Sequence, residues 1–186
     1  MVKKSKLNRS EFSNNVKPSY NSKFSNNVKP PYNSKFSIDL YSLQFSQASY
    51  KDFVITGEFT DNIGNSLIKL DNTYPVKLEF TATNAKLGYY LKGKIFYKLQ
   101  GQCSRCLAGL TDKTIINEFT AFFTEQNNKN EDCETYQLWG NIINLEPIIF
   151  DTVGSNIDYN PICGEGCKGL CSNCGVNLNT SFEHNC

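Results

Sequence analysis

The chain has 186 residues, of which 39% are hydrophobic and 20% are charged, so it can form one packed domain with an appendage. Its eight cysteines are too few for a secreted disulfide scaffold, and we find neither a membrane-length apolar run nor a signal peptide, so we expect reduced thiols that bind metal or do redox chemistry. Residues 1–35 carry about +7 and the remainder about −6, which excludes the uniformly basic surface typical of many nucleic-acid-binding domains.

The N-terminal segment is a tandem repeat. Residues 10–21 read SEFSNNVKPSYN and residues 22–33 read SKFSNNVKPPYN. Each unit offers one Phe, one Val and one Tyr for burial, which is too little to offset the entropy of ordering its backbone. We therefore expect residues 1–35 to be a disordered basic arm. Its role is open between none, RNA attraction and organelle targeting.

Residues 36–160 are expected to form a β-rich body. Apolar and polar side chains alternate most clearly over residues 87–103, and a period of two is typical of a half-buried strand. Further strands are expected at 36–45, 52–60, 76–81 and 111–124, with a polar loop at 126–135. One helix is expected over about 144–158, with Asn144 as its cap and Pro147 in its first turn. The predicted fold class is α+β, a predominantly antiparallel β body with this one helix and a zinc-knuckle-like tail.

The tail, residues 161–186, is too poor in apolar residues to fold without a cross-link such as a bound metal ion. We therefore expect it to bind metal and to pack on the body. It reads Cys163-x3-Cys167-x3-Cys171-x2-Cys174-Gly175, followed by His184 and Cys186, and a further Cys103-x2-Cys106 ends the long strand. A C-x2-C turn lets two thiolates bind one tetrahedral ion.

These eight residues can fill two structural zinc sites. We expect one site with four thiolates and one with three thiolates and an imidazole, and we assign them to Cys103, Cys106, Cys163 and Cys167 and to Cys171, Cys174, His184 and Cys186. Cys133 has no partner by spacing. Redox use of Cys103 and Cys106 is an alternative, although no βαβ unit precedes them, and unused thiols are another. A catalytic zinc would need an open position and an acid, and nothing distinguishes Glu165 or Glu183 from surface residues.

Basic residues form a second candidate site. No acid occurs between Glu79 and Asp112, and Lys92, Lys94 and Lys98 share one strand face with aromatic side chains. This pattern, continued by Arg105, suits RNA phosphates and stacked bases, although a solvated strand face explains it equally well.

The motifs together resemble a known family. Cys103-Ser-Arg-Cys106-Leu107, the segment opened by Asn144-Leu145-Glu146 and the tail CKGLCxxCGxNLN are similar to the YceD family, the large ribosomal RNA subunit accumulation proteins. The resemblance covers about residues 38–186. Members usually end this region with C-x-C, where this chain has His184-Asn185-Cys186. The resemblance implies a role in processing or accumulation of large-subunit rRNA in bacteria or plastids, without an established enzymatic activity.

The sequence thus predicts a non-enzymatic factor for large-subunit rRNA processing and ribosome assembly. Its expected partners are large-subunit rRNA or a pre-ribosomal particle, or an assembly protein, with neither a membrane nor a small-molecule substrate. The expected location is the bacterial cytoplasm or the plastid stroma. The alternatives are a thiol-redox or metal-dependent enzyme and a zinc-stapled protein-interaction module.

Overall fold

The computed structural model describes residues 34–44, 50–110, 114–125, 134–181 and 183–186. The repeat units and Cys133 lie outside the described residues, so the expectations about them stay predictions. In chain order the elements are β1 (Ser37–Asp39), α1 (Tyr41–Gln44), β2 (Tyr50–Gly57), β3 (Ile68–Leu70), β4 (Val76–Ala85), β5 (Gly88–Gln102), β6 (Gly109–Leu110), β7 (Thr114–Thr124), β8 (Glu134–Gln137), β9 (Ile142–Asn144) and α2 (Glu146–Asn156).

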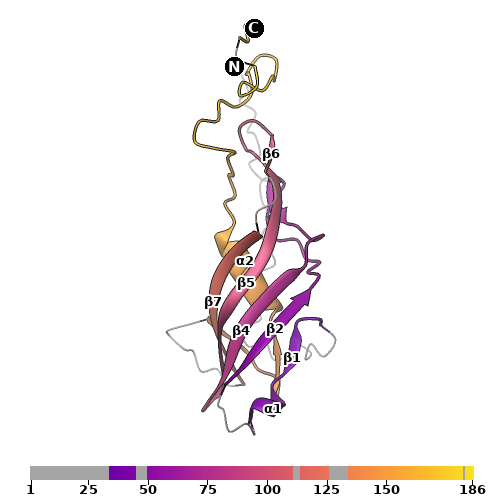
Figure 1. Cartoon of the computed structure of the whole chain (residues 1–186), viewed down its shortest axis with the longest axis vertical. Coiled ribbons are helices and arrows are strands. Elements are labelled where there is room, and N and C mark those ends of the chain that lie inside the picture. The colour runs from indigo at the N-terminus through magenta and orange to yellow at the C-terminus, as the bar shows by residue number, and fades with distance from the viewer. Residues whose placement is uncertain (1–33, 45–49, 111–113, 126–133, 182) are drawn as a thin grey trace, which may run out of the picture.

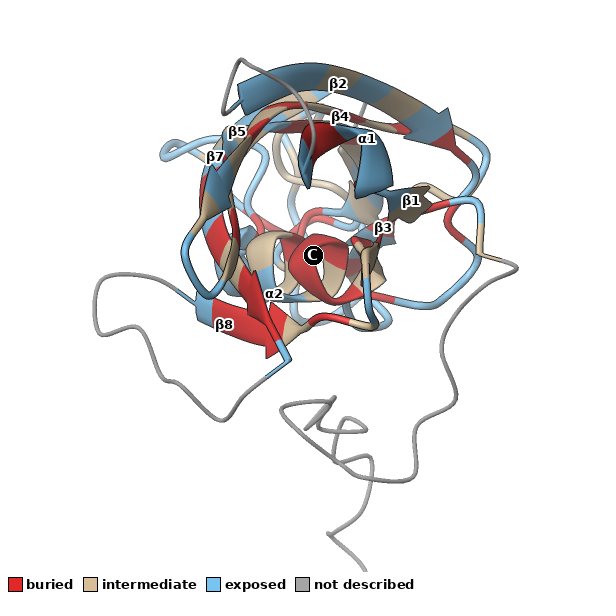
Figure 2. Cartoon of the chain, turned by 90° about the horizontal axis from the view of Figure 1, so that it is seen from below, coloured by how far each residue is buried: buried red, intermediate tan, exposed pale blue. Residues whose placement is uncertain are grey.

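The main sheet has the strand order β2-β4-β5-β7-β8, and its pairs are antiparallel except for the parallel pair of β7 and β8. It curls around α2, which lies in its hollow (Figures 1 and 2). The far end of β5 extends beyond β4 and pairs with β3 and β6. The expected α+β body, predominantly antiparallel, is confirmed.

The core lies between the sheet and α2. The inward side chains of β5, among them Leu91, Ile95 and Tyr97, are buried, and so are Ile149 and Val153 of α2. Gly93 stands within this inward row of β5. A Cβ atom at that position would lie 2.2 Å from the carbonyl oxygen of Glu79, so only glycine allows β4 and β5 to approach this closely.

Three local expectations need correction. The helix runs from Glu146 to Asn156, and its N-cap is Leu145, which makes no side-chain capping bond, in place of the expected Asn144. Asn144 lies one residue before the N-cap, and its Oδ1 accepts the Glu146 N–H at 3.1 Å. The strand expected over 36–45 ends at Asp39, since Leu43 belongs to α1 and is buried. The loop expected over 126–135 gives way to β8 at Glu134, which pairs with β7.

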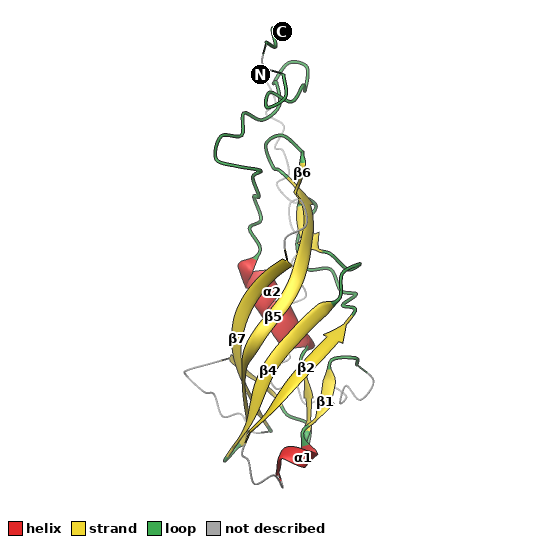
Figure 3. Cartoon of the chain, in the orientation of Figure 1, coloured by secondary structure: helices red, strands yellow, loops and turns green. Residues whose placement is uncertain are grey.

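Beyond the sheet, the chain continues as a loop-rich region that we call the tip and define as residues 103–110 and 161–186. Figure 3 shows it extending past the end of α2, mostly without regular secondary structure. It begins where β5 ends and includes every cysteine of the described residues. In the described part of the chain, no helix is long and apolar enough to span a membrane.

Candidate metal centres

The turn between β5 and β6 forms the first cysteine knuckle. Cys103 N–H donates to the Ala108 carbonyl at 2.8 Å, and Leu107 N–H donates to the Cys103 carbonyl at 3.0 Å. These bonds close the turn so that both thiols point to the same side of it, and both cysteines are buried. The Arg105 N–H lies 3.4 Å from Cys103 Sγ and donates to it.

The segment after α2 supplies two more thiols to this knuckle. Ser104 N–H donates to the Pro161 carbonyl at 2.8 Å, which holds the two segments together. Cys103 Sγ then lies 3.7 Å from Cys167 Sγ, and Cys106 Sγ lies 3.6 Å from Cys163 Sγ. Sulfurs at about 2.3 Å from a tetrahedral zinc ion are about 3.8 Å apart, so the spacing fits one ion. We call these residues the four-cysteine group.

The second group repeats the first knuckle's backbone geometry. Cys171 N–H donates to the Val176 carbonyl at 2.8 Å, and Gly175 N–H donates to the Cys171 carbonyl at 2.9 Å. His184 Nε2 lies 3.1 Å from Cys174 Sγ. Cys171, Cys174, His184 and Cys186 place their ligand atoms within 4.8 Å of one another and form what we call the Cys/His group.

Asn179, which no motif marks as a candidate ligand, connects the two groups. Its Oδ1 accepts the Lys168 N–H at 2.8 Å, and its Nδ2 lies 3.6 Å from Cys167 Sγ. Leu178 N–H also donates to the Gly169 carbonyl at 3.0 Å. The chain that leaves the second knuckle therefore returns to a thiol of the four-cysteine group. The sequence feature that could have pointed to Asn179 is the Asn-Leu-Asn triplet at the end of the tail motif.

Hydrogen bonding makes one thiol of each group unusually acidic. Burial by itself raises the pKa of Cys103, but backbone N–H groups of Cys106, Arg105 and Cys163 outweigh it and lower the pKa to about 6. Backbone N–H groups of Cys174 and Asn173 lower the pKa of Cys171 to about 6. A thiolate is the form that binds metal, so each group offers a ready first ligand.

Neighbouring thiols have the opposite effect on the pKa of one further cysteine in each group. Cys167 and Cys106 raise the pKa of Cys163 to about 12, and Cys174 and Cys171 raise the pKa of Cys186 to about 11. Without a cation, the thiols of one group cannot all ionise at this separation, since like charges repel. A divalent ion removes that repulsion, so the donor sets suit a metal.

The structure thus brings together the two sets of four residues that the spacing suggested, and each set can hold a metal ion. Neither set includes a carboxylate among the described residues. Four protein ligands fill a tetrahedral ion and leave no position for water or substrate, so the arrangement is typical of a structural site.

We call Lys92, Lys94 and Lys98 on the outer sheet face the lysine face, and two of them, Lys94 and Lys98, have acidic neighbours from other strands or loops. Strand register places Lys94 between Glu79 of β4 and Glu118 of β7, with its Nζ 3.8 Å from a Glu118 oxygen. Lys98 Nζ lies 4.5 Å from the ring centre of Tyr74, whereas Lys92 lies between Thr81 and Thr120.

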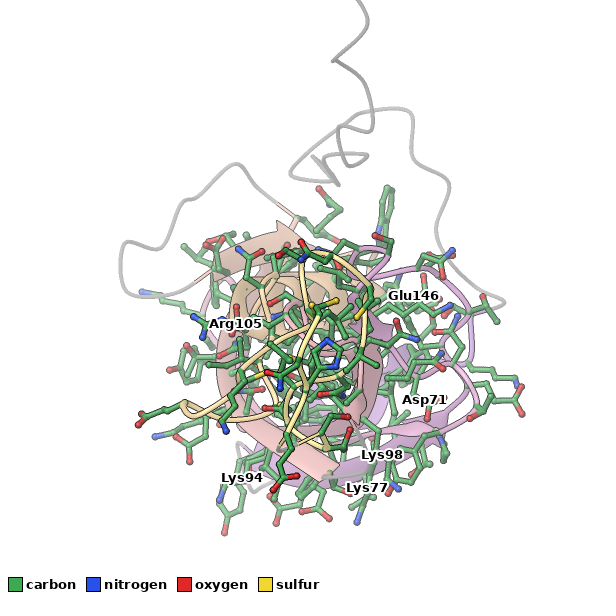
Figure 4. All side chains as sticks on the ribbon, turned by 90° about the horizontal axis from the view of Figure 1, so that it is seen from above. Asp71, Lys77, Lys94, Lys98, Arg105 and Glu146 are labelled. Carbon is green, nitrogen blue, oxygen red and sulfur yellow. The ribbon has the colours of Figure 1, made fainter. Side chains whose placement is uncertain are left out.

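Arg105 lies apart from the lysine face. Figure 4 shows it away from the labelled lysines, in the region of the tip. Its Nη1 lies 3.5 Å from the Cys167 carbonyl oxygen and donates to it, so the guanidinium reaches across the four-cysteine group. The lysines and Arg105 therefore form two separate positive features.

Comparisons with known proteins agree with the motif. The sequence model described as "Large ribosomal RNA subunit accumulation protein YceD" matches residues 91–186. Uncharacterized proteins of Mycobacterium bovis and Mycobacterium tuberculosis are 28% identical over 125 residues, which is 66% of this chain and 60% of theirs. An uncharacterized protein of Mycobacterium leprae is 24% identical over 62% of this chain and 55% of its own length. The matched region therefore spans about 60% of the curated relatives, and no solved structure gives a significant match.

Proposed function

The chain belongs to the YceD family of large ribosomal RNA subunit accumulation proteins, and on this premise we propose that it is a non-enzymatic factor in the processing of large-subunit rRNA and in ribosome assembly. The observation that carries the non-enzymatic part is the geometry of the two ligand sets. Each uses four protein ligands and leaves no coordination position for a reactant. The site of action we propose is the compartment in which these ribosomes assemble, the bacterial cytoplasm or the plastid stroma.

We propose zinc as the ion of both groups, two per chain. Thiolate and imidazole ligands in tetrahedral sets select zinc over hard cations such as magnesium or calcium. The four-cysteine group joins the β5–β6 turn to the segment after α2, so its ion would hold the tip to the body. Elemental analysis of protein purified without chelator should give about two zinc ions per chain. A metal-free protein with a reversible Cys103–Cys106 disulfide would overturn this and favour the thiol-redox alternative.

The proposed partner is large-subunit rRNA within a pre-ribosomal particle, contacted through the lysine face and Arg105. The acidic neighbours of Lys94 reduce its contribution, and Asp71 beside Lys98 reduces that of Lys98, so Lys92 carries more of the contact. Exposed ammonium groups pair with phosphates and release counterions, which makes such binding sensitive to salt.

A charge-neutralising variant tests the RNA contact. Changing Lys92, Lys94 and Lys98 together to Gln should reduce co-sedimentation with large-subunit precursors and flatten its salt dependence, and it should lower mature large-subunit rRNA in cells. The matched control changes Lys35, Lys51 and Lys86 to Gln, which removes the same charge from exposed positions elsewhere. Equal co-sedimentation of both variants with the parent would show that the lysine face is only solvated.

A further inference from the structure

The two ligand groups of the tip differ in how deeply the fold encloses them. Cys103 and Cys106 follow directly after β5 and are 0% and 4% exposed, so half of the four-cysteine group is covered by the protein. None of the ligands of the Cys/His group is buried, and two of them, Cys174 and Cys186, are exposed. Solvent and competing ligands therefore reach the Cys/His group more easily.

Backbone hydrogen bonds hold both segments of the four-cysteine group. The Ser104 N–H bond to the Pro161 carbonyl, at 2.8 Å, joins the first knuckle to the segment after α2, and the Cys167 N–H donates to the Gly164 carbonyl at 3.1 Å. Asn179 adds its contact to Cys167 Sγ at 3.6 Å. If one thiol let go of a bound ion, these bonds would keep it close to the other three, and preorganised ligands of this kind favour rebinding.

The Cys/His group has backbone support for only half of its ligands. Cys171 and Cys174 belong to the second knuckle, which two backbone bonds close. His184 and Cys186 lie on residues 183–186, and no backbone–backbone hydrogen bond joins these residues to another part of the described chain. His184 Nε2 lies 3.1 Å from Cys174 Sγ, so this segment meets the knuckle through its ligand side chains.

We propose that the Cys/His group is an exchangeable zinc site, whereas the four-cysteine group holds its ion permanently. This rests on the proposed zinc content and adds to it how the two sites are regulated. His184 and Cys186 leave together with the segment that carries them, and the knuckle then keeps only two ligands, too few to compete with a chelating ligand in solution. Occupancy of the Cys/His group therefore follows the available zinc by mass action, while the four-cysteine group keeps the tip attached to the body.

Cadmium-113 NMR of the full chain measures each group separately. Cadmium bound by four thiolates and cadmium bound by three thiolates and an imidazole differ in chemical shift, so the loaded protein should give two signals. Added EDTA should remove the signal of the Cys/His group first, at a concentration about 10–100-fold lower than the other signal requires. Simultaneous loss of both signals, or earlier loss of the four-thiolate signal, overturns this proposal and leaves the zinc content standing. Binding of fewer than two ions overturns both.

Variants separate backbone support from the chemistry of the ligands. His184→Cys gives the Cys/His group four thiolates on the same unsupported segment, so its ion should still be the first to leave. If this variant releases both ions together, the imidazole causes the difference and the argument from the backbone is wrong.

A matched pair removes one exposed thiol from each group. Cys186→Ser should lose the ion of the Cys/His group at the lowest EDTA concentration and keep the four-thiolate signal. Cys163→Ser should retain an ion on its three remaining thiols, because backbone bonds hold their segments in place. Far-UV circular dichroism checks that both variants fold. Equal loss of the ion from the altered group in both variants overturns the proposal.

Discussion

In the body, α2 buries Ile149 and Val153 against the main seven-stranded sheet, whereas in the described part of residues 161–186 only Pro161 and Gly169 are buried. The body therefore gains its stability from apolar surface removed from water. The tip has almost none of that contribution, and its segments meet through backbone hydrogen bonds and through the two groups of residues that could hold metal ions. The two regions should respond to different perturbations, and each perturbation should leave the other region in place.

Metal removal should have the largest effect, and it should be confined to the tip. The binding free energy of a structural zinc ion is about 10–16 kcal/mol in small zinc domains and is there the folding free energy itself. After chelation, amides of residues 161–186 should exchange within the dead time, while those of β4, β5 and α2 stay protected. Hydrogen exchange followed by mass spectrometry measures both regions in one sample. Loss of protection throughout β5 would show that body and tip fold as one unit.

The converse experiment weakens the body and leaves the tip. Leu91 is fully buried on β5, and Leu91→Ala should lower the free energy of unfolding by about 2–5 kcal/mol through lost burial and a cavity. Zinc per chain should stay the same in the folded protein. Leu87→Ala is the control, since its side chain is 55% exposed and its change should cost little. The measurement is denaturant unfolding followed by far-UV circular dichroism, with elemental analysis of the same preparations.

The contrast between the regions also explains what the sequence could predict. The alternation in β5 follows from strand geometry, and the spacing of a C-x2-C turn follows from the need of two thiols to reach one ion. Both are local patterns, so both could be recognised in the sequence. Neighbours across strands depend on register between distant segments. The positions of Glu79 and Glu118 beside Lys94, and the pairing of β8 with β7, follow from that register. No short pattern in the sequence encodes them.

The tip shows the same division between local and non-local information. Spacing shows only that a knuckle offers two thiols and must find two more, whereas the fold decides which residues join each knuckle in the two groups that could hold a metal ion. The contact of Asn179 with Cys167 joins residues of separate turns, and spacing gave no reason for it. The sequence did not predict the left-handed backbone conformation of Leu107, because glycine is the residue expected at that position of a knuckle.

Asn179 should tune metal affinity in the tip without affecting the body. Asn179→Ala removes the contact to Cys167 Sγ and the acceptor of the Lys168 N–H, so zinc should dissociate about 10–100-fold more readily from the four-cysteine group. Competition with a chromophoric chelator measures this, and denaturant unfolding of the body should not change. Asn185→Ala is the control, since Asn185 is exposed near the Cys/His group. Equal zinc affinity in both variants would mean that the Asn179 contact is incidental.

The smallest effect is expected where the N-terminal segment meets the body. Ser34 Oγ donates to Glu146 Oε1 at 2.6 Å and accepts the Phe36 N–H at 3.1 Å, so Ser34 ties the first strand to the start of α2. Removal of residues 1–33 should leave the unfolding free energy and zinc content unchanged. Removal of residues 1–35 should cost about 1 kcal/mol, which is typical of a net hydrogen bond.

Two point variants separate Ser34 from its neighbour in the full chain. Ser34→Ala should reproduce the cost of about 1 kcal/mol, because it leaves the Glu146 carboxylate without that donor. Lys35→Ala should have no measurable effect, since both side chains of its ion pair with Glu58 are largely exposed, at 66% and 71%. Urea unfolding of the two truncated proteins and the two point variants, each compared with the full chain, is the measurement. If removal of residues 1–33 alone lowers stability as much as removal of residues 1–35, the repeat contributes to the fold, and the expectation that it buries no apolar surface is wrong.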